Sequence, residues 1–274
     1  MGARLCGQDG ALATISPSNI SPSNIAPSGI APSDIASSDR LIVALDVATV
    51  EAARGLVGRL GAGVTFYKIG LELVMAGGLA LVHELADKGK HVFLDMKLLD
   101  IETTVERATR NAAAAGATFL TVHAQDAKTL RAALAGRAGT DLKVLGVTVL
   151  TNLEAADLRQ QGIAAEPADV VARRAELARH VGCDGVVVSG LEAARVRAIV
   201  GASRAIVTPG IRLPGADAGD QARVCPPRQA IAAGADYLVV GRPITCADDP
   251  AAAVGVFHRE IEHGLRLRAL GPQG

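Results

Sequence analysis

The sequence predicts a single-domain (β/α)8 barrel, and three observations support this α/β fold class. Short apolar and β-branched runs alternate with alanine-rich amphipathic stretches from Arg40 onward, which is typical of repeated βα units with a parallel sheet. We count eight such units over about 235 residues, close to the ~250 residues of a typical (β/α)8 barrel. No G-x-G-x-x-G motif follows the first run, which counts against an open dinucleotide-binding sheet.

The predicted strands are almost continuously apolar, as expected of strands buried on both faces of a parallel sheet. They cover residues 40–46, 65–70, 91–97, 119–124, 143–150, 185–189, 205–211 and 237–244. The stretches between them carry apolar residues at helical spacing, for example in residues 51–60, 104–116, 167–182 and 192–201. We expect these helices to cover the outside of the barrel.

Residues 1–38 differ in composition from the rest of the chain. They contain a five-residue repeat, SPSNI, SPSNI, APSGI, APSDI and ASSDR, which is rich in proline and serine and too poor in apolar residues to form a core. We expect residues 1–38 to be a disordered low-complexity tail and residues 39–274 to form the barrel domain. A short solenoid is the alternative, but prolines in four of the five units count against it.

Composition excludes several classes of function. The 274 residues are 49% hydrophobic, and 28 basic residues balance 28 acidic ones, without the basic patch of a nucleic-acid-binding protein. No apolar run approaches the ~18 residues of a membrane span, and the amino terminus lacks a signal-peptide core. The scattered cysteines have no C-x-x-C spacing and are typical of a reducing compartment. We therefore predict a cytoplasmic protein that binds neither nucleic acid nor membranes.

The segment HVFLDMKLLDI, residues 91–101, is the strongest functional signal. Its apolar run ends in Asp95 and Lys97, with Asp100 three residues further on. Alternation along a strand puts Asp95 and Lys97 on one face, about 6.6 Å apart. Ionised groups at the end of a buried strand are costly to desolvate unless they are paired. The pattern therefore indicates a functional site, with a structural ion pair as the alternative.

Polar side chains end nearly every other predicted strand as well. They include Asp46, Lys68, His123, Thr151, Ser189, Arg212 and Arg242. Because the carboxyl ends of barrel strands converge on one mouth, where active sites of this fold lie, these residues predict an active site. Gly241 and Arg242 follow the eighth strand, where such barrels often bind phosphate, and they supply a close backbone approach and a guanidinium fork.

Seven motifs in order extend this pattern to a known family. They are A-L-D ending at Asp46, Y-K-I-G around Lys68, D-M-K-L-L-D-I at residues 95–101, V-T-V-L-T ending at Thr151, T-P-G-I-R ending at Arg212, A-G-D-Q ending at Gln221 and V-G-R-P around Arg242. Between Leu41 and about His258 the chain resembles the orotidine 5′-phosphate decarboxylases. The resemblance implies a cofactor-free, dimeric barrel enzyme that converts orotidine monophosphate to uridine monophosphate in pyrimidine synthesis.

The resemblance also implies roles in catalysis. Lys97 matches the proton donor to C6 of the pyrimidine, and Asp95 matches the carboxylate beside the carboxylate of the substrate. Lys68 and Asp100 would complete an alternating array of lysines and aspartates. Asp100 and Thr104 would reach into the site of the neighbouring subunit.

Further residues match the binding positions of the family. Asp46 corresponds to a ligand of the ribose hydroxyls and Thr151 to a position near the pyrimidine. Gln221 and Arg242 resemble the loop that closes over the phosphate, and Arg212 and Gly241 would line the same region. The chain departs from the family at one point, because Glu102 and Thr103 stand where proline and asparagine usually follow D-I.

Two alternatives remain at the level of sequence. A metal-dependent 3-keto sugar-phosphate decarboxylase or hexulose-phosphate synthase shares D-x-K-x-x-D but presents a glutamate from the second strand as a metal ligand. Here that strand presents Lys68, whose ammonium beside Asp46 and Asp95 would oppose a divalent cation, so we expect no metal and no other cofactor. A non-catalytic barrel that binds phosphate ligands would keep Arg242 and Gln221 but would not need the charged array.

Overall fold

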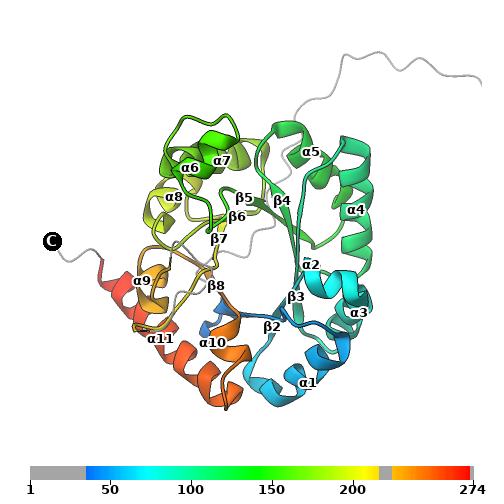
Figure 1. Cartoon of the computed structure of the whole chain (residues 1–274), viewed down its shortest axis with the longest axis vertical. Coiled ribbons are helices and arrows are strands. Elements are labelled where there is room, and N and C mark those ends of the chain that lie inside the picture. Colours follow the sequence, from blue (N-terminus) through cyan, green and yellow to red (C-terminus); the bar gives the residue numbers. More distant parts are fainter. Residues whose placement is uncertain (1–34, 216–223, 272–274) are drawn as a thin grey trace, which may run out of the picture.

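A computed structural model describes residues 35–215 and 224–271 of the chain. In this part of the chain, eight parallel strands form a closed barrel in which each strand pairs with the next and β8 pairs with β1. Helices surround the strands on the outside (Figure 1). The predicted (β/α)8 fold is therefore confirmed. The part of the predicted tail that covers residues 1–34 lies outside the described residues.

The strands are three to eight residues long. Their bounds are β1 Leu41–Ala44, β2 Phe66–Gly70, β3 His91–Leu98, β4 Phe119–His123, β5 Lys143–Val147, β6 Gly185–Val187, β7 Ala205–Thr208 and β8 Tyr237–Val240. Several predicted strands extended too far at their carboxyl ends. β5 ends at Val147, and the segment after Gly241 forms a short helix. Val149 and Ile244 are buried without strand pairing, so burial rather than pairing explains the apolar pattern there.

The helices lie where the amphipathic stretches predicted them, with additional short turns between them. Their bounds are η2 Ser37–Arg40, α1 Val50–Leu60, η3 Gly61–Gly63, α2 Leu71–Leu73, η4 Val74–Gly78, α3 Leu79–Asp87, α4 Glu102–Ala114, α5 Ala127–Gly136, α6 Ala155–Gln160, α7 Pro167–Val181, α8 Ala193–Val200, α9 Pro227–Ala232, α10 Arg242–Thr245 and α11 Pro250–Leu270. Side chains of Thr49, Asp126 and Asp249 accept the free backbone N–H groups at the starts of α1, α5 and α11. None of the helices in the described ranges is long and apolar enough to cross a membrane.

Alternation along the strands produces two hydrophobic clusters. Side chains such as Leu41 and Val43 pack with the surrounding helices, whereas Ile42 belongs to a smaller cluster inside the barrel. Aromatic rings fill the amino-terminal end of this interior, with ring centroids 5.0 Å apart for Phe66 and Phe119 and 5.2 Å apart for Phe119 and Tyr237. The carboxyl ends of the strands surround the open end of the interior.

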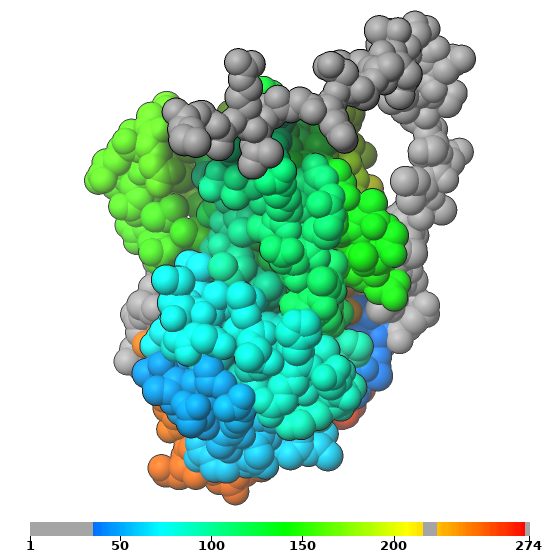
Figure 2. All heavy atoms as spheres, turned by 90° about the vertical axis from the view of Figure 1, so that its right-hand side faces the viewer, coloured from blue at the N-terminus to red at the C-terminus, as the bar shows by residue number. Residues whose placement is uncertain are grey.

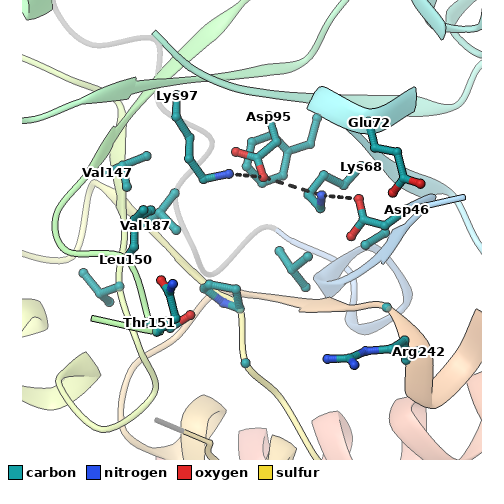
Figure 3. A pocket seen from close by; sticks show the side chains of 18 of the residues that line it. Asp46, Lys68, Glu72, Asp95, Lys97, Val147, Leu150, Thr151, Val187 and Arg242 are labelled. Atoms are coloured by element: carbon teal, nitrogen blue, oxygen red, sulfur yellow. Dashed lines mark hydrogen bonds and ion pairs between the residues drawn. The ribbon is translucent and has the colours of Figure 1, made fainter. Parts of the chain in front are cut away.

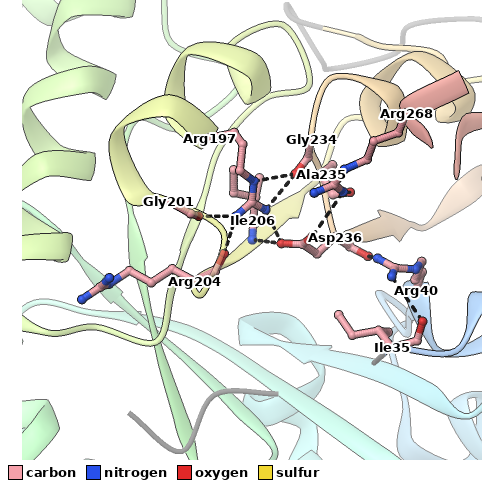
Figure 4. A network of polar contacts seen from close by, with 10 residues as sticks. All are labelled: Ile35, Arg40, Arg197, Gly201, Arg204, Ile206, Gly234, Ala235, Asp236 and Arg268. Carbon is pink, nitrogen blue, oxygen red and sulfur yellow. Dashed lines mark hydrogen bonds and ion pairs between the residues drawn. The ribbon is translucent and has the colours of Figure 1, made fainter. Parts of the chain in front are cut away.

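A network of polar contacts surrounds Asp236 at the amino-terminal end of the barrel (Figure 4). Asp236, directly before β8, is fully buried and forms ion pairs with Arg197 and, at 3.4 Å, with Arg268. Arg40 donates to the backbone carbonyls of Asp236 and Ile35, both at 3.2 Å. These contacts fix the chain before β1 and join it to α8, β8 and α11, at the end of the barrel opposite the mouth.

Candidate active site

The period of two along the strands places the charged residues at the mouth. Lys68 is the inward-facing position that follows Phe66 in β2, and Asp95 follows Phe93 in the same way in β3. The register pairs Lys68 with Phe93, so Asp95 lies two residues, or one inward-facing position, nearer the mouth than Lys68. Asp46 follows the inward-facing Ala44 just after β1. The alternation that places apolar side chains in the barrel interior therefore also places Asp46, Lys68 and Asp95 at its mouth.

The four charged side chains form one continuous chain of ion pairs (Figure 3). Lys68 Nζ lies 2.8 Å from Asp46 Oδ1 and 3.5 Å from Asp95 Oδ2. Lys97 Nζ lies 2.8 Å from the same Asp95 oxygen. The order is therefore Asp46, Lys68, Asp95, Lys97, with opposite charges at each step.

Burial differs along this chain of charges. The side chains of Lys68 and Asp95 are 11% and 12% exposed, whereas Lys97 and Asp46 are 30% and 52% exposed. Burial disfavours the charged Asp95, but the positive charges of Lys68 and Lys97 outweigh it and lower the pKa of Asp95. Burial likewise disfavours the Lys68 ammonium, and the Asp95 and Asp46 carboxylates outweigh it and raise the pKa of Lys68. The two buried groups hold each other ionised, while Lys97 and Asp46 are open to a ligand.

The backbone at Lys97 departs from the regular strand that the sequence predicted. Its φ is 48°, in the left-handed region, and it is the non-glycine residue with a positive φ among the described residues. The pairing of β3 with β4 shifts register between Leu94 and Leu98 at the same place. The Lys97 N–H donates to Thr121 Oγ1 in β4 at 2.9 Å. Regular alternation therefore does not describe Lys97, although its ammonium still meets Asp95.

These groups line a cavity of about 620 Å³ at the mouth of the barrel. The predicted site residues that line it are Asp46, Lys68, Asp95, Lys97, Thr151, Arg212, Gly241 and Arg242. Val147, Leu150 and Val187 form an apolar wall on the side of β5 and β6, and Arg242 lies across the cavity from the ion pairs (Figure 3). The cavity thus has a charged side, an apolar side and a cationic end.

Some described residues that the sequence placed at the site do not line this cavity, namely Asp100, Thr104, Ser189 and His123. Asp100 is exposed just before α4 and Thr104 is exposed in the first turn of α4. The Asp100 carboxylate accepts the N–H of Ile101 at 2.6 Å. Asp100 and Thr104 lie outside the lining of the cavity in their own chain. Gln221 lies outside the described residues.

Residues 39–256 match the family model described as "Orotidine 5'-phosphate decarboxylase / HUMPS family". The chain belongs to this family. A protein named orotidine 5'-phosphate decarboxylase from Methylorubrum extorquens (strain PA1) is 57% identical over 224 residues, which are 82% of this chain and 96% of the relative. The protein of the same name from Bradyrhizobium sp. (strain BTAi1 / ATCC BAA-1182) is 52% identical over 229 residues, covering 84% of this chain and 94% of the relative.

Solved structures agree with this assignment. The crystal structure of orotidine 5'-phosphate decarboxylase from Lactobacillus acidophilus superposes with a TM-score of 0.72 at 34% sequence identity. The match covers 81% of this chain and 99% of that chain. The recognised resemblance to the orotidine 5′-phosphate decarboxylase family is therefore confirmed.

The sequence did not single out several residues of this family member's cavity. Glu72 lines it beside Asp46 (Figure 3). Asn152, next in sequence to Thr151, and Thr245, in the same short helix as Arg242, also line it. Asn152 directly follows the predicted site residue Thr151, and this position in the sequence could have identified it as a lining residue. Glu72 and Thr245 lie on short helical turns that the sequence did not predict.

His123 ends β4 near the charged residues but does not line the cavity. Burial lowers the pKa of this histidine, and the positive charges of Arg174 and Lys97 lower it further. The imidazole is therefore neutral near pH 7. A structural role fits this position.

Proposed function

We propose that this protein decarboxylates orotidine 5′-monophosphate to uridine 5′-monophosphate in pyrimidine biosynthesis. The observation that carries the proposal is the chain of ion pairs from Asp46 through Lys68 and Asp95 to Lys97, at the edge of a cavity with a cationic opposite end. The protein is a carboxy-lyase of the orotidine 5′-phosphate decarboxylase family, as the names of relatives with 57% and 52% identity support. The site residues and their roles below are our proposal.

The shape of the cavity suggests how the nucleotide binds. Arg242 and the backbone at Gly241 would hold the phosphate, with Arg212 and Gln221 in the same region. Asp46 would accept hydrogen bonds from ribose hydroxyls, since its carboxylate is half exposed. Thr151 lies beside the apolar wall of Val147, Leu150 and Val187, which suits the faces of a pyrimidine ring. This orientation puts C6 of the ring on the side of Lys97.

The chemistry explains why an ammonium is needed at that point. When the bond from C6 to the carboxylate carbon breaks, its electron pair stays on C6, where no adjacent carbonyl delocalises it. The Lys97 ammonium stabilises this localised charge and then gives its proton to C6, after which the neutral amine is reprotonated from solvent. A fixed cation that is already paired with Asp95 costs little reorganisation during the reaction.

Asp95 has a second role in this account. Its pKa is lowered, so it is ionised when substrate binds and repels the carboxylate of the substrate. That repulsion is relieved as neutral CO2 forms. Enzymes lower barriers by roughly 8–23 kcal/mol, and a single ion pair cannot supply such an amount. The phosphate and ribose contacts must therefore contribute through ordering and desolvation of the site.

The metal-dependent alternative is opposed by the position of Lys68. Its Nζ lies between Asp46 and Asp95, where a cation shared by these carboxylates would have to bind. The described residues contain no group of three or more His, Cys, Asp or Glu side chains that could hold a metal ion.

Formation of uridine monophosphate from orotidine monophosphate, followed in the presence of excess EDTA, tests this proposal. We expect turnover that EDTA does not reduce. Turnover that disappears with EDTA and returns with magnesium would favour the sugar-phosphate enzymes, and binding of the nucleotide without turnover would favour a non-catalytic barrel.

We also propose that the protein is a homodimer with active sites at the interface. Most of the exposed large apolar side chains of the described residues lie in the segments from α2 to the start of α4. They are Leu71, Met75, Leu79, Leu99 and Ile101. This side of the barrel faces the viewer in cyan and green in Figure 2. Exposed large apolar side chains that lie close together are typical of a protein interface, and Asp100 and Thr104 belong to the same part of the chain. Sedimentation equilibrium should give the mass of a dimer.

We infer a cytoplasmic location and a single barrel domain, predicted at residues 39–274 and preceded by a tail predicted at residues 1–38. Of that tail, Ile35 packs against the barrel interior and Ser37–Arg40 form a helical turn. Among the described residues, Cys183 and Cys225 are buried free thiols and Cys246 is an exposed one, in keeping with a reducing compartment. We expect a small nucleotide to be the principal ligand, with no role for nucleic acid or membranes.

A further inference from the structure

Thr121 in β4 connects the two groups that the proposed reaction uses most directly. Its side chain is completely buried. The Thr121 hydroxyl oxygen accepts the backbone N–H of Lys97 at 2.9 Å and lies 2.9 Å from Asp95 Oδ1. An N–H can only donate and a carboxylate can only accept, so the single hydroxyl proton must point to Asp95. The direction of both hydrogen bonds is thereby fixed.

The geometry around Thr121 shows what these two bonds hold. Lys97 has a left-handed backbone, and the β3 to β4 pairing is irregular between Leu94 and Leu98. A lysine persists in this conformation only where its surroundings hold it, and the bond to Thr121 is one such constraint. On Asp95, Oδ1 is bound by Thr121 while Oδ2 faces the two ammonium groups. The hydroxyl therefore fixes both the rotation of the carboxylate and the point from which the Lys97 side chain extends.

Other buried threonines of the barrel differ from Thr121. The hydroxyl of Thr148, just after β5, donates to the backbone carbonyl of Val187 at 2.9 Å, and the ionised side chain that this residue contacts, Arg174, binds its backbone carbonyl and not its hydroxyl. Its hydroxyl bond supports the fold alone. Thr148 thus provides a matched control, with the same side chain, the same burial and one buried hydrogen bond.

We propose that Thr121 is a positioning residue for decarboxylation, which sets the relative placement of the Lys97 ammonium and the Asp95 carboxylate. This inference rests on the proposed function. Thr121 does not line the cavity and so has no contact of its own with the substrate. Its effect should therefore appear in the chemical step and not in the affinity for the nucleotide.

The proposal is tested with three variants: Thr121→Val, Thr121→Ser and Thr148→Val. For each variant, kcat and KM are measured with orotidine monophosphate, and the affinity for uridine monophosphate is measured separately. Valine keeps the shape of threonine but cannot accept the Lys97 N–H or donate to Asp95. We expect Thr121→Val to lower kcat by about tenfold to a hundredfold, as for the loss of a hydrogen bond to a charged group, with KM and nucleotide affinity changed less than about twofold. Thr121→Ser should restore most of the lost kcat.

The control separates a positioning role from a structural one. Thr148→Val loses a buried hydroxyl bond as well, and we expect it to keep kcat within about twofold of the unsubstituted protein while losing a comparable amount of stability. Unchanged kcat in a folded Thr121→Val variant, or equal losses in the valine and serine variants, would overturn the inference. If the unsubstituted protein itself forms no uridine monophosphate, the proposed function fails instead.

Discussion

Lys97 Nζ and Asp95 Oδ2 form a 2.8 Å ion pair at the end of β3, even though the backbone of Lys97 has left the extended conformation that would place the two side chains on one face. The pair is held from two sides. Lys68 shares the same carboxylate oxygen at 3.5 Å, and Thr121 binds the other oxygen. The exposed end of this arrangement is the Lys97 ammonium, which faces the cavity.

The shared-site proposal predicts complementation between inactive dimers. If Asp100 acts on the substrate of the partner subunit and Lys97 on that of its own, a heterodimer of Lys97→Ala and Asp100→Ala has one doubly damaged site and one intact site. Random reassembly makes about half of the dimers heterodimers, so about a quarter of all sites should be intact. Activity should rise when the two variants are dissociated, mixed and reassembled.

A mixture of Lys97→Ala with Asp95→Ala provides the matched control. Both residues belong to the site of their own chain, so no heterodimer has an intact site and activity should not rise. If the first mixture stays at the average of its parents while subunit exchange is demonstrated, Asp100 serves its own chain and the cross-subunit role is wrong.

The sequence predicted the barrel from eight apolar runs that alternate with amphipathic stretches, and it predicted most of the cavity from the polar residues that end those runs. Apolar residues at alternate positions define the inward face, and the next inward positions beyond Phe66 and Phe93 are Lys68 and Asp95. The role of Asp100 does not follow from the geometry of one chain, because it requires the active site of a second subunit.

The geometry at Lys97 could not be predicted in the same way. The register shift in β3 belongs to its pairing with the neighbouring strand β4, which the composition of one strand does not encode. The role of Thr121 depends on that shift, since its hydroxyl meets the Lys97 N–H only where the pairing becomes irregular. The inward position of a hydroxyl in the apolar run of β4 is the signal that could have drawn attention to it.

The mutual stabilisation of Lys68 and Asp95 predicts a change on removal of Lys68. Lys68 is the largest of the influences that lower the pKa of Asp95 against its burial. The Lys68→Met variant should therefore raise the pKa of Asp95, which NMR titration of the labelled carboxyl carbon would measure. An unchanged pKa would show that Lys68 does not hold Asp95 ionised.

The same shift has a consequence for stability. Because the folded-state pKa of Asp95 is lowered, its contribution to the free energy of unfolding is present above the unfolded-state pKa of about 3.9 and is lost as pH falls through the folded-state pKa. In Lys68→Met the loss should still begin near the unfolded-state pKa, but it should be smaller and should end at higher pH than in the unsubstituted protein. Urea unfolding at a series of acidic pH values would compare the two curves.

Two truncated proteins, one lacking residues 1–34 and one lacking residues 1–38, test which part of the amino-terminal segment contributes to stability. Removal of residues 1–34 should leave the melting temperature and kinetics unchanged, since this sequence offers too little apolar surface to form a core. Removal of residues 1–38 also takes Ile35, which packs against the interior cluster and whose carbonyl accepts from Arg40. This longer truncation should lower the melting temperature by about 2–4 °C, as expected for a loss near 1 kcal/mol.

Calorimetry of the two truncated proteins and the full chain would measure these differences. Equal melting temperatures for all three would show that Ile35 contributes nothing to stability. A drop already present on removal of residues 1–34 would show that the repeat packs against the barrel.

The Lys97→Ala variant tests the central claim most directly, in single-turnover assays of uridine monophosphate formation alongside measured affinity for uridine monophosphate. We expect the rate to fall by about 10²–10⁴-fold or more, as for the loss of a positioned general acid, while nucleotide binding persists because the phosphate and ribose contacts lie elsewhere. Lys88→Ala, which removes an exposed lysine paired with Glu84, should leave both unchanged. A folded Lys97→Ala variant with near-normal turnover would contradict the account.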